Sequence, residues 1–297
     1  MLKNIGVAVA VIVALVVAWS PAARGAEEPA KPAVAPATQP ADGLTLDLGG
    51  NVAMKFAKIP AGTFLMGSPE TEKARSTDEG PQHEVAISKA FHLGIYPVTQ
   101  EQYQQIVGEN PSATKGPSHP VEHVPWEKAV AFCKKLSEKT GKIVRLPTEA
   151  EFEYATRAGT TTRYFYGDDL KYEQMGDYAW WYQNCGWDIH PVGQKKPSPW
   201  GLYDVYGNVW QWCSDWCGDT YPSEKQTDPK GPATGEYRVL RGGCWLIGHH
   251  TMDDGQGRML SRSALRGTPG YYNFDRGDRP PLKDAGRIGF RVVVDSQ

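Results

Sequence analysis

Several potential metal ligands lie close together near the end of the chain. His249 and His250 are followed by Asp253 and Asp254, and Cys244 precedes them. Imidazole, carboxylate and thiolate groups are donors to transition metals, and histidine can also transfer protons near neutral pH. Two glycines follow in the same polar segment, which is equally typical of a solvated loop. The pattern therefore indicates either a polar surface loop or a site whose catalytic candidates are Cys244, His249 and His250.

Three carboxylates alternate in the segment 148–157. Glu149, Glu151 and Glu153 resemble the paired carboxylates of general acid–base catalysis. Thr148 followed by Glu151, however, is a capping box that opens a helix. We therefore expect Glu151 to cap this helix and the other two carboxylates to be solvated or paired with Arg157.

The stretch Gly201–Trp212, GLYDVYGNVWQW, combines glycines and aromatic residues with Asp204 and Asn208. Glycine disfavours a helix by about 1 kcal/mol relative to alanine, and the stretch is poor in the β-branched residues of strands. Seven of the ten tryptophans lie between Trp180 and Trp216, which places this stretch in an aromatic core or beneath an aromatic pocket. We expect an irregular loop anchored by rings, with its polar groups facing something polar.

The five cysteines are Cys133, Cys185, Cys213, Cys217 and Cys244. An exported protein can form disulfides, and an odd number leaves at least one thiol. We expect one or two disulfides, with Cys185 joined to Cys213 or Cys217. A redox or metal role is the alternative, although no Cys-x-x-Cys pair or zinc spacing is present.

The N-terminus has the pattern of an export signal. Lys3 precedes the apolar run Ile5–Trp19, and small residues follow at 23–26. This predicts a signal peptide at 1–26, a Pro/Ala-rich linker at 27–43 and one domain at 44–297 in the periplasm or outside the cell. If the N-terminal segment is retained, it would contact the membrane. The net charge of −2 and pI near 6.4 offer no basic field for nucleic acid.

Apolar periodicity predicts an α+β domain. Met54–Met66 is expected to form a hairpin and His83–Leu93 a strand. Capping signals and apolar stripes predict helices at Thr99–Val107, Pro125–Lys139 and Thr148–Arg157. Beyond Gly159, regular structure is expected only in two short strands, Tyr237–Leu240 and Ile288–Val294. A coil of about 75 residues is unusual in a compact domain, so metal, disulfides or tryptophan packing should fix it.

Seven motifs in a fixed order carry a family resemblance. They are Phe56–Ser68 (FAKIPAGTFLMGS), Tyr96–Tyr103 (YPVTQEQY), Pro120–Cys133 (PVEHVPWEKAVAFC), Arg145–Gly159 (RLPTEAEFEYATRAG), Gly201–Trp212 (GLYDVYGNVWQW), Arg238–Trp245 (RVLRGGCW) and Gly289–Val292 (GFRV). Over residues 54–294 the chain resembles the formylglycine-generating enzyme family, also called sulfatase-modifying factor domains. The resemblance implies a variant of the C-type lectin fold, α+β and low in regular secondary structure, stabilised by calcium.

The resemblance also implies what the family's chemistry would require. Its namesake enzymes oxidise a sulfatase cysteine with oxygen and a copper ion held by two cysteines, which follow the Arg-Gly-Gly motif by fixed steps. The same steps from Arg241 lead here to Ile247 and Met252. Cys244 lies three residues before the first of these positions, where the namesakes have serine. Sulfatase oxidation by the family's mechanism is therefore not expected, and copper or iron is doubtful.

A calcium site of the family corresponds to four positions of the glycine-rich stretch. They are Asp204 and Gln211 through side-chain oxygens, and Gly207 and Val209 through carbonyls; calcium accepts both kinds of oxygen. The alternative is that Asp204 caps a turn and Gln211 bonds the backbone. We further expect Arg241 and Arg291 to hold the C-terminal core by pairing with carboxylates.

Two functions are consistent with these features. The favoured one is a non-catalytic or accessory binding module for a peptide, glycan or small ligand, for example on an exported protein. The aromatic, arginine and histidine residues suited to its groove are Trp245, His249, His250, Arg266, Tyr271, Tyr272 and Asn273. The alternative is an oxygen- or metal-dependent oxidoreductase that modifies an exported protein or metabolite, with altered ligands such as Cys244 and His249.

Overall fold

The computed structural model describes residues 43–72, 75, 77–245 and 287–296, all within one compact unit, Val34–Gln297. The predicted signal peptide and nearly all of the predicted linker lie outside the described residues. Within the described part, no helix is long and apolar enough to cross a membrane.

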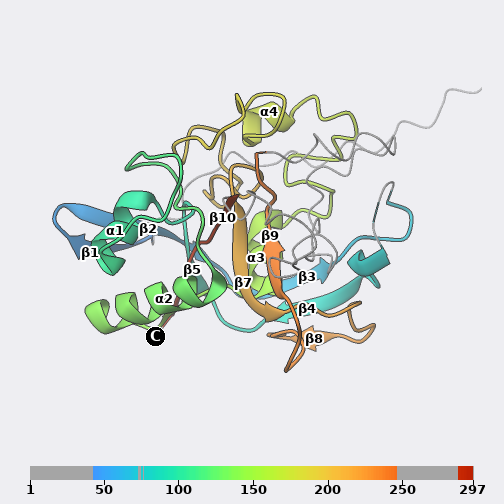
Figure 1. Cartoon of the computed structure of the whole chain (residues 1–297). Coiled ribbons are helices and arrows are strands. Elements are labelled where there is room, and N and C mark those ends of the chain that lie inside the picture. Colours follow the sequence, from blue (N-terminus) through green and yellow to red (C-terminus); the bar gives the residue numbers. More distant parts are fainter. Residues whose placement is uncertain (1–42, 73–74, 76, 246–286, 297) are drawn as a thin grey trace, which may run out of the picture. The chain divides into compact units, whose positions relative to one another are not determined.

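The largest sheet has five strands in the order β1-β2-β5-β11-β6, and every neighbouring pair is antiparallel. The last strand of the chain thus lies inside this sheet, beside segments that precede it by some 150 to 200 residues (Figure 1). Its strands are β1 (Leu44–Gly49), β2 (Val52–Ile59), β5 (Phe91–Gly94), β6 (Val144–Arg145) and β11 (Val293–Asp295).

Two smaller sheets have three strands each. One has the order β10-β7-β9, and the other has the order β3-β4-β8. Their strands are β3 (Gly62–Met66), β4 (His83–Ile87), β7 (Trp210–Trp216), β8 (Gln226–Thr227), β9 (Arg238–Arg241) and β10 (Ile288–Gly289). A short 3₁₀ helix, η1 (Thr77–Glu79), lies between β3 and β4.

The strands predicted at Met54–Met66 and His83–Leu93 exist, but their predicted pairing is wrong. The first does not fold back on itself: β2 pairs with β5, and β3 pairs with β4. Ile59 lies opposite Phe91, and Gly62 lies opposite Ile87. The two segments, 52–66 and 83–94, therefore pass together from one sheet to the other. The Pro-Ala-Gly sequence therefore forms a corner in a bent antiparallel ladder, where the prediction placed a reversing turn.

The three predicted helices are confirmed, with their caps. They are α1 (Gln100–Val107), α2 (Trp126–Thr140) and α3 (Glu149–Arg157). The side chains of Thr99 and Thr148 accept the predicted capping bonds, and Gln102 and Glu151 bond back to the cap residues. Buried residues of α1 and α2 pack with the five-stranded sheet, as Figure 1 shows on the α1–α2 side of the fold.

The segment after Gly159 contains more regular structure than predicted. A short helix, α4 (Met175–Tyr178), and the strands β7 and β8 lie in it. Stacked rings fill the space between them: Tyr166 stacks on Tyr178 with centroids 4.3 Å apart, and Phe165 stacks on Tyr206 at 5.4 Å. Tyrosine and phenylalanine rings thus help to fix this segment, where tryptophan packing was expected.

Disulfides are not part of that packing. The structure contains all five cysteines as thiols, so the expected bond from Cys185 to Cys213 or Cys217 is wrong. Cys213 packs with Phe152 and Val239, and burial raises the pKa of its thiol. Burial also raises the pKa of Cys133, to about 12. Neither thiol is poised to ionise near neutral pH.

Candidate functional site

The buried guanidinium of Arg291 holds the stretch Gly201–Trp212 in place. Its Nη2 donates to the carbonyls of Tyr203, at 2.9 Å, and Asp204, at 3.0 Å. Its Nε donates to Oε1 of Gln211, and Nη1 donates to the carbonyl of Gly94 at 3.0 Å. The expected carboxylate pairing is wrong for Arg291, because neutral oxygens satisfy it; burial lowers its pKa to about 10.

Asp204 is the one buried carboxylate of this stretch. Its Oδ2 accepts the backbone N–H of Gly193 at 2.7 Å, and Oδ1 accepts Nδ2 of Asn208 at 3.4 Å. Burial raises its pKa, against the effect of these hydrogen bonds. Gln211 donates through Nε2 to the carbonyl of Asp204 at 2.9 Å. Both predicted side-chain ligands of calcium thus take part in hydrogen bonds within the protein.

These residues fit calcium unequally. Each carboxylate oxygen of Asp204 has one hydrogen-bond donor and keeps lone pairs, as a calcium ligand requires. Oε1 of Gln211 faces the positive charge of Arg291, which competes with a cation for that oxygen. We therefore propose that calcium, where it binds, is held by Asp204 and the carbonyls of Gly207 and Val209, with Gln211 contributing least.

Gly207 is required by a close approach of two backbones. Its φ is +70°, and a Cβ placed there would lie 2.2 Å from the carbonyl oxygen of Trp180. The next residue, Asn208, donates its N–H to the same oxygen at 2.9 Å. The contact fixes the stretch against the segment that carries Trp180 and His190, whose rings stack with centroids 3.7 Å apart.

Below this stretch, α3 and β9 are joined by buried charges. Arg241 donates to Glu149 at 3.1 Å and to Glu153 at 2.7 Å. Glu153 also accepts from Arg157. Although burial acts to raise it, the charges of Arg157 and Arg241 hold the pKa of Glu153 at about 2. The expected pairing is confirmed for Arg241 and Glu153, whereas Glu149 is buried and not solvated.

The Arg-Gly-Gly-Cys-Trp turn starts from this anchored arginine. Gly242 and Gly243 have positive φ, which permits the turn directly after β9. Cys244 then packs in an apolar cluster with Trp210, Leu240 and Ile288. Cys244 is buried, at 4% exposure, and its role as a catalytic candidate stays a prediction.

Trp245 belongs to an aromatic group at the end of the turn. Its backbone N–H donates to the carbonyl of Asn208 at 3.1 Å. Its ring lies edge to face with that of Trp187, with centroids 6.4 Å apart. The guanidinium of Arg287 lies 4.3 Å from the Trp245 ring centroid. Trp245 itself is 8% exposed, whereas Trp187 is 57% exposed. We call Trp187, Trp245 and Arg287 the Trp187 surface.

The rest of the predicted groove lies outside the described residues. This holds for the catalytic candidates His249 and His250, and for Arg266, Tyr271, Tyr272 and Asn273. The described residues that flank this segment, Trp245 and Arg287, lie side by side. Among the side chains that the structure describes, no cluster of three or more His, Cys, Asp or Glu could hold a metal ion.

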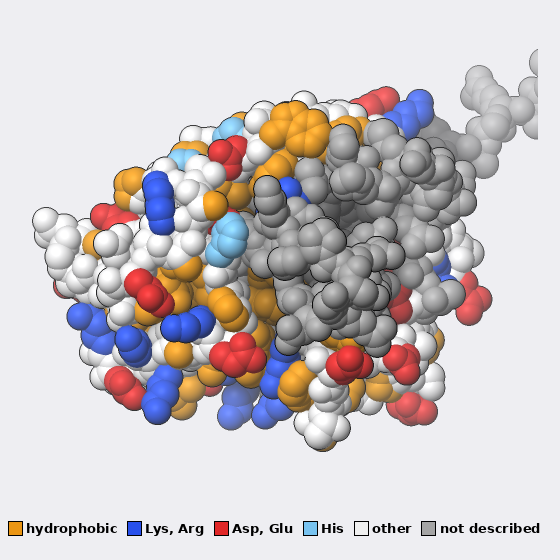
Figure 2. All heavy atoms as spheres, in the orientation of Figure 1, with side chains coloured by type: hydrophobic (Ala, Val, Ile, Leu, Met, Phe, Trp, Pro, Cys, Tyr) orange, Lys and Arg blue, Asp and Glu red, His pale blue; other side chains and the backbone are white. Residues whose placement is uncertain are grey.

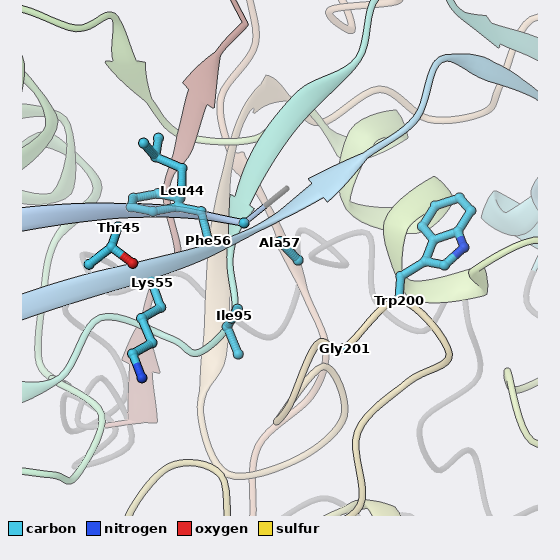
Figure 3. A pocket seen from close by; sticks show the side chains of 9 residues that line it. Leu44, Thr45, Lys55, Phe56, Ala57, Ile95, Trp200 and Gly201 are labelled. Atoms are coloured by element: carbon cyan, nitrogen blue, oxygen red, sulfur yellow. The ribbon is translucent and has the colours of Figure 1, made fainter. Parts of the chain in front are cut away.

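A small pocket beside the glycine-rich stretch offers few groups that could take part in chemistry. It has a volume of about 100 Å³ and lies between β1, β2 and the Trp200–Gly201 turn. Figure 3 shows Leu44 and Phe56 together on one side and Trp200 on the other. Lys55 is its one charged residue. On the face shown in Figure 2, charges of both signs are interspersed among hydrophobic side chains in the coloured part.

Sequence reasoning missed two residues that the structure brings forward. Trp187 is an exposed tryptophan, which was counted among the tryptophans between Trp180 and Trp216 but not placed in the groove. Asp215 lies in β7 with 3% exposure. An alternating polar pattern in WQWCSDW could have signalled a strand with a buried face, had the glycines before it not favoured a loop.

Comparison with known proteins places these features in a family. The model of the sulfatase-modifying factor enzyme 1-like domain matches residues 50–296. The formylglycine-generating enzyme of Streptomyces coelicolor is 38% identical over 200 residues, which cover 64% of this chain and 57% of that enzyme. That of Thermomonospora curvata is 30% identical, over 82% of this chain and 94% of its own. The solved Treponema denticola variable protein 1 superposes with a TM-score of 0.68 at 28% identity, over 87% of this chain and 100% of that one.

Replacement of Arg291 should destabilise the whole domain. Arg291→Met leaves the oxygens of Gln211, Gly94, Tyr203 and Asp204 without their donor in a buried place. We expect a loss of about 3–5 kcal/mol in the free energy of unfolding, measured by urea denaturation. Lys196→Met, at an exposed ion pair, is the control and should leave the midpoint unchanged. A midpoint equally unchanged in Arg291→Met would contradict the anchoring role.

Removal of calcium should lower the melting temperature if the glycine-rich stretch holds the ion. We expect excess chelator to lower it and added calcium to restore it, because a ligand that binds only the folded state stabilises that state. Asp204→Ala should melt at one temperature with or without chelator. Unchanged melting of the natural chain in chelator would rule out a stabilising calcium ion.

Proposed function

Since the chain belongs to the sulfatase-modifying factor enzyme 1-like domain family, we propose that it uses this fold for binding and not for oxidation. The observation that carries the proposal is the pair Ile247 and Met252, which stand where the family's copper-binding cysteines are expected. Neither side chain can supply a thiolate. The chain's own five cysteines lie elsewhere, at positions that the structure describes as buried or partly buried.

The surroundings of Cys244 support this proposal. It is the cysteine nearest in sequence to the expected copper positions, and the alternative oxidoreductase depends on it. It is 4% exposed and packs with Trp210, Leu240 and Ile288. To bind a metal, the thiol of Cys244 would have to ionise, and its burial in an apolar cluster disfavours the thiolate.

The Trp187 surface supports a role in recognition. Tryptophan and arginine contribute most to binding energy at protein interfaces. Here the exposed Trp187 lies edge to face with Trp245, and Arg287 lies over the Trp245 ring. The turn that carries Trp245 is fixed from below by Arg241 and its two carboxylates. A rigid aromatic patch of this kind suits a peptide or glycan, including one carried by an exported protein.

Export is a further part of the proposal and rests on the sequence alone. A positively charged start, an apolar run and small residues at 23–26 have the order of a cleavable signal. The domain would then work in the periplasm or outside the cell. A retained apolar segment would instead tether it to the membrane.

The alternative function is an oxygen- or metal-dependent oxidoreductase. It is favoured by the relatives named formylglycine-generating enzymes and by the histidines at 249 and 250. Its ligands would differ from a cysteine pair, with Cys244 and His249 as candidates, and its substrate would be an exported protein or a metabolite.

The chain should not oxidise a cysteine-containing sulfatase peptide. We expect mass spectrometry to find the peptide unchanged after incubation with copper, a reductant and oxygen, because positions 247 and 252 lack thiols. The Streptomyces coelicolor enzyme is the positive control. A double variant, Ile247→Cys with Met252→Cys, tests whether the missing pair alone explains the inactivity. Aldehyde formation by the natural chain would overturn the proposal.

Binding should depend on the exposed tryptophan. An array of peptides and glycans probed with the natural chain identifies a ligand, and Trp187→Ala should weaken its binding by about tenfold or more. Leu170→Ala, at another exposed apolar side chain of 49% exposure, serves as the matched control. Equal affinities of the two variants would exclude the Trp187 surface as the binding site.

A further inference from the structure

A second group of titratable residues lines a cavity that shares no residue with the Trp187 surface. The cavity has a volume of about 280 Å³ and lies where α3 begins, where β7 ends and where residues 229–232 pass. Acidic, aromatic and proline side chains line most of it. A concave site with apolar walls and a few convergent polar groups is the usual form of a ligand site.

Asp215 contributes the polar group of interest. Its side chain is buried, at 3% exposure of the residue, and it lines the cavity. Its Oδ2 accepts the N–H of Glu149 at 3.0 Å and the hydroxyl of Ser214 at 3.0 Å. Among the described residues, no hydrogen-bond donor reaches Oδ1. Oδ1 is not among the buried side-chain atoms that lack a partner, so it is accessible from the cavity and can accept a hydrogen bond from a molecule bound there.

Capping of α3 does not provide one. The side chain of Thr148 already caps this helix, through the N–H of Glu151. The extra bond from Glu149 to Asp215 uses Oδ2 only. Oδ1 therefore has no part in holding the helix.

The buried carboxylates around the cavity differ in their ion pairs. Three carboxylates, Glu149, Glu153 and Asp215, are buried here with two guanidinium groups, Arg157 and Arg241. Both guanidiniums pair with Glu149 or Glu153, and neither forms an ion pair with Asp215. Among the residues that the structure describes, Asp215 is thus the carboxylate of these three that forms no ion pair, and it faces the cavity.

Two further cations lie near Asp215. One packs against aromatic rings, and the other is exposed to solvent. Arg238 lies over the rings of Trp126, at 3.7 Å, and Trp216, at 3.4 Å, and donates to the carbonyl of Ser214. Lys230 lies on the cavity lining but is exposed to solvent and forms no ion pair with a described residue. Arg238 interacts electrostatically with Asp215, but neither Arg238 nor Lys230 forms an ion pair with it.

We propose that this cavity binds an ammonium group at the end of a short aliphatic chain, such as a lysine side chain, with Oδ1 of Asp215 as its acceptor. One open oxygen suits the compact charge of an ammonium better than the bidentate fork of a guanidinium. The walls fit the aliphatic part and the cation, because Met66 and three prolines provide apolar contact and Trp216 and Tyr221 provide rings.

The protonation state of Asp215 makes this binding depend on pH. Burial, with the neighbouring charge of Glu149, raises its pKa to about 7. The carboxyl is therefore largely neutral at pH 6 and ionised at pH 8, so an ammonium should bind about tenfold more tightly at pH 8. The charged or titratable groups facing Asp215 are Glu149 and Glu151 of α3, His83 of β4, Tyr221, Lys230, and Arg238 and Arg241 of β9.

The experiment titrates the full chain with Nα-acetyl-lysine N-methylamide, followed by NMR or calorimetry. We expect binding that strengthens from pH 6 to pH 8, and no binding of the norleucine analogue, which has the same chain without the charge. Asp215→Asn keeps the size of the side chain and an acceptor for Glu149. It should weaken binding by about tenfold to a hundredfold and remove the pH dependence.

Several outcomes would overturn the proposal. They are equal affinity for the norleucine analogue, unchanged affinity in Asp215→Asn, and a pH dependence that persists in this variant. Should Asp215→Asn not fold, Lys230→Glu at the rim provides a second test. It should strengthen binding of the lysine derivative but not of its norleucine analogue, and an unchanged lysine affinity would exclude the site. Cadaverine as a second probe distinguishes a free diamine from a lysine of a peptide.

Discussion

The guanidinium of Arg291 is the interaction on which the arrangement of this domain depends. It comes from the last segment of the chain and donates to the carbonyl of Gly94 at the end of β5 and to three oxygens of the stretch Gly201–Trp212. These partners are separated by more than a hundred residues in sequence. Because the group is buried, a hydrogen bond left unmade would cost free energy, so the three segments are held where Arg291 can reach them all. The short strands of the C-terminal segment, β10 and β11, are placed on either side of it.

A second buried arginine, Arg241, anchors the turn that leads to the Trp187 surface. Arg241 joins β9 to α3 through Glu149 and Glu153, and the chain turns at Gly242 and Gly243 directly after it. Cys244 then enters an apolar cluster, and Trp245 supports the exposed ring of Trp187. The same helix, α3, borders a separate cavity that Asp215 lines. The fold thus presents a rigid aromatic surface and an acidic cavity, and both depend on the same helix.

Local signals in the sequence were sufficient for some of this structure. The capping boxes of Thr99 and Thr148 and the apolar stripe of Trp126–Thr140 identified three helices, because a helix closes its hydrogen bonds within one segment. Strand partners were harder, since pairing is decided by residues far away: the Pro-Ala-Gly corner has the composition of a turn, yet Ile59 pairs with Phe91. Arg291 was expected to pair with a carboxylate but donates to backbone carbonyls. A pattern of side chains in the sequence cannot predict such a partner, because every residue has a carbonyl. The glycines of 201–207 masked β7, whose edges are set by β9 and β10.

The chain belongs to the sulfatase-modifying factor enzyme 1-like domain family. Our proposal that it does not oxidise a substrate rests on the absence of the expected cysteine pair. The most direct measurement of this point is the copper content of the purified full chain after loading with Cu(I) in competition with a chromophoric chelator. We predict that no stoichiometric copper stays with the protein, because Ile247 and Met252 offer no thiolate and Cys244 lies in an apolar cluster. One equivalent of copper that is retained by the natural chain and lost in Cys244→Ala would contradict this account.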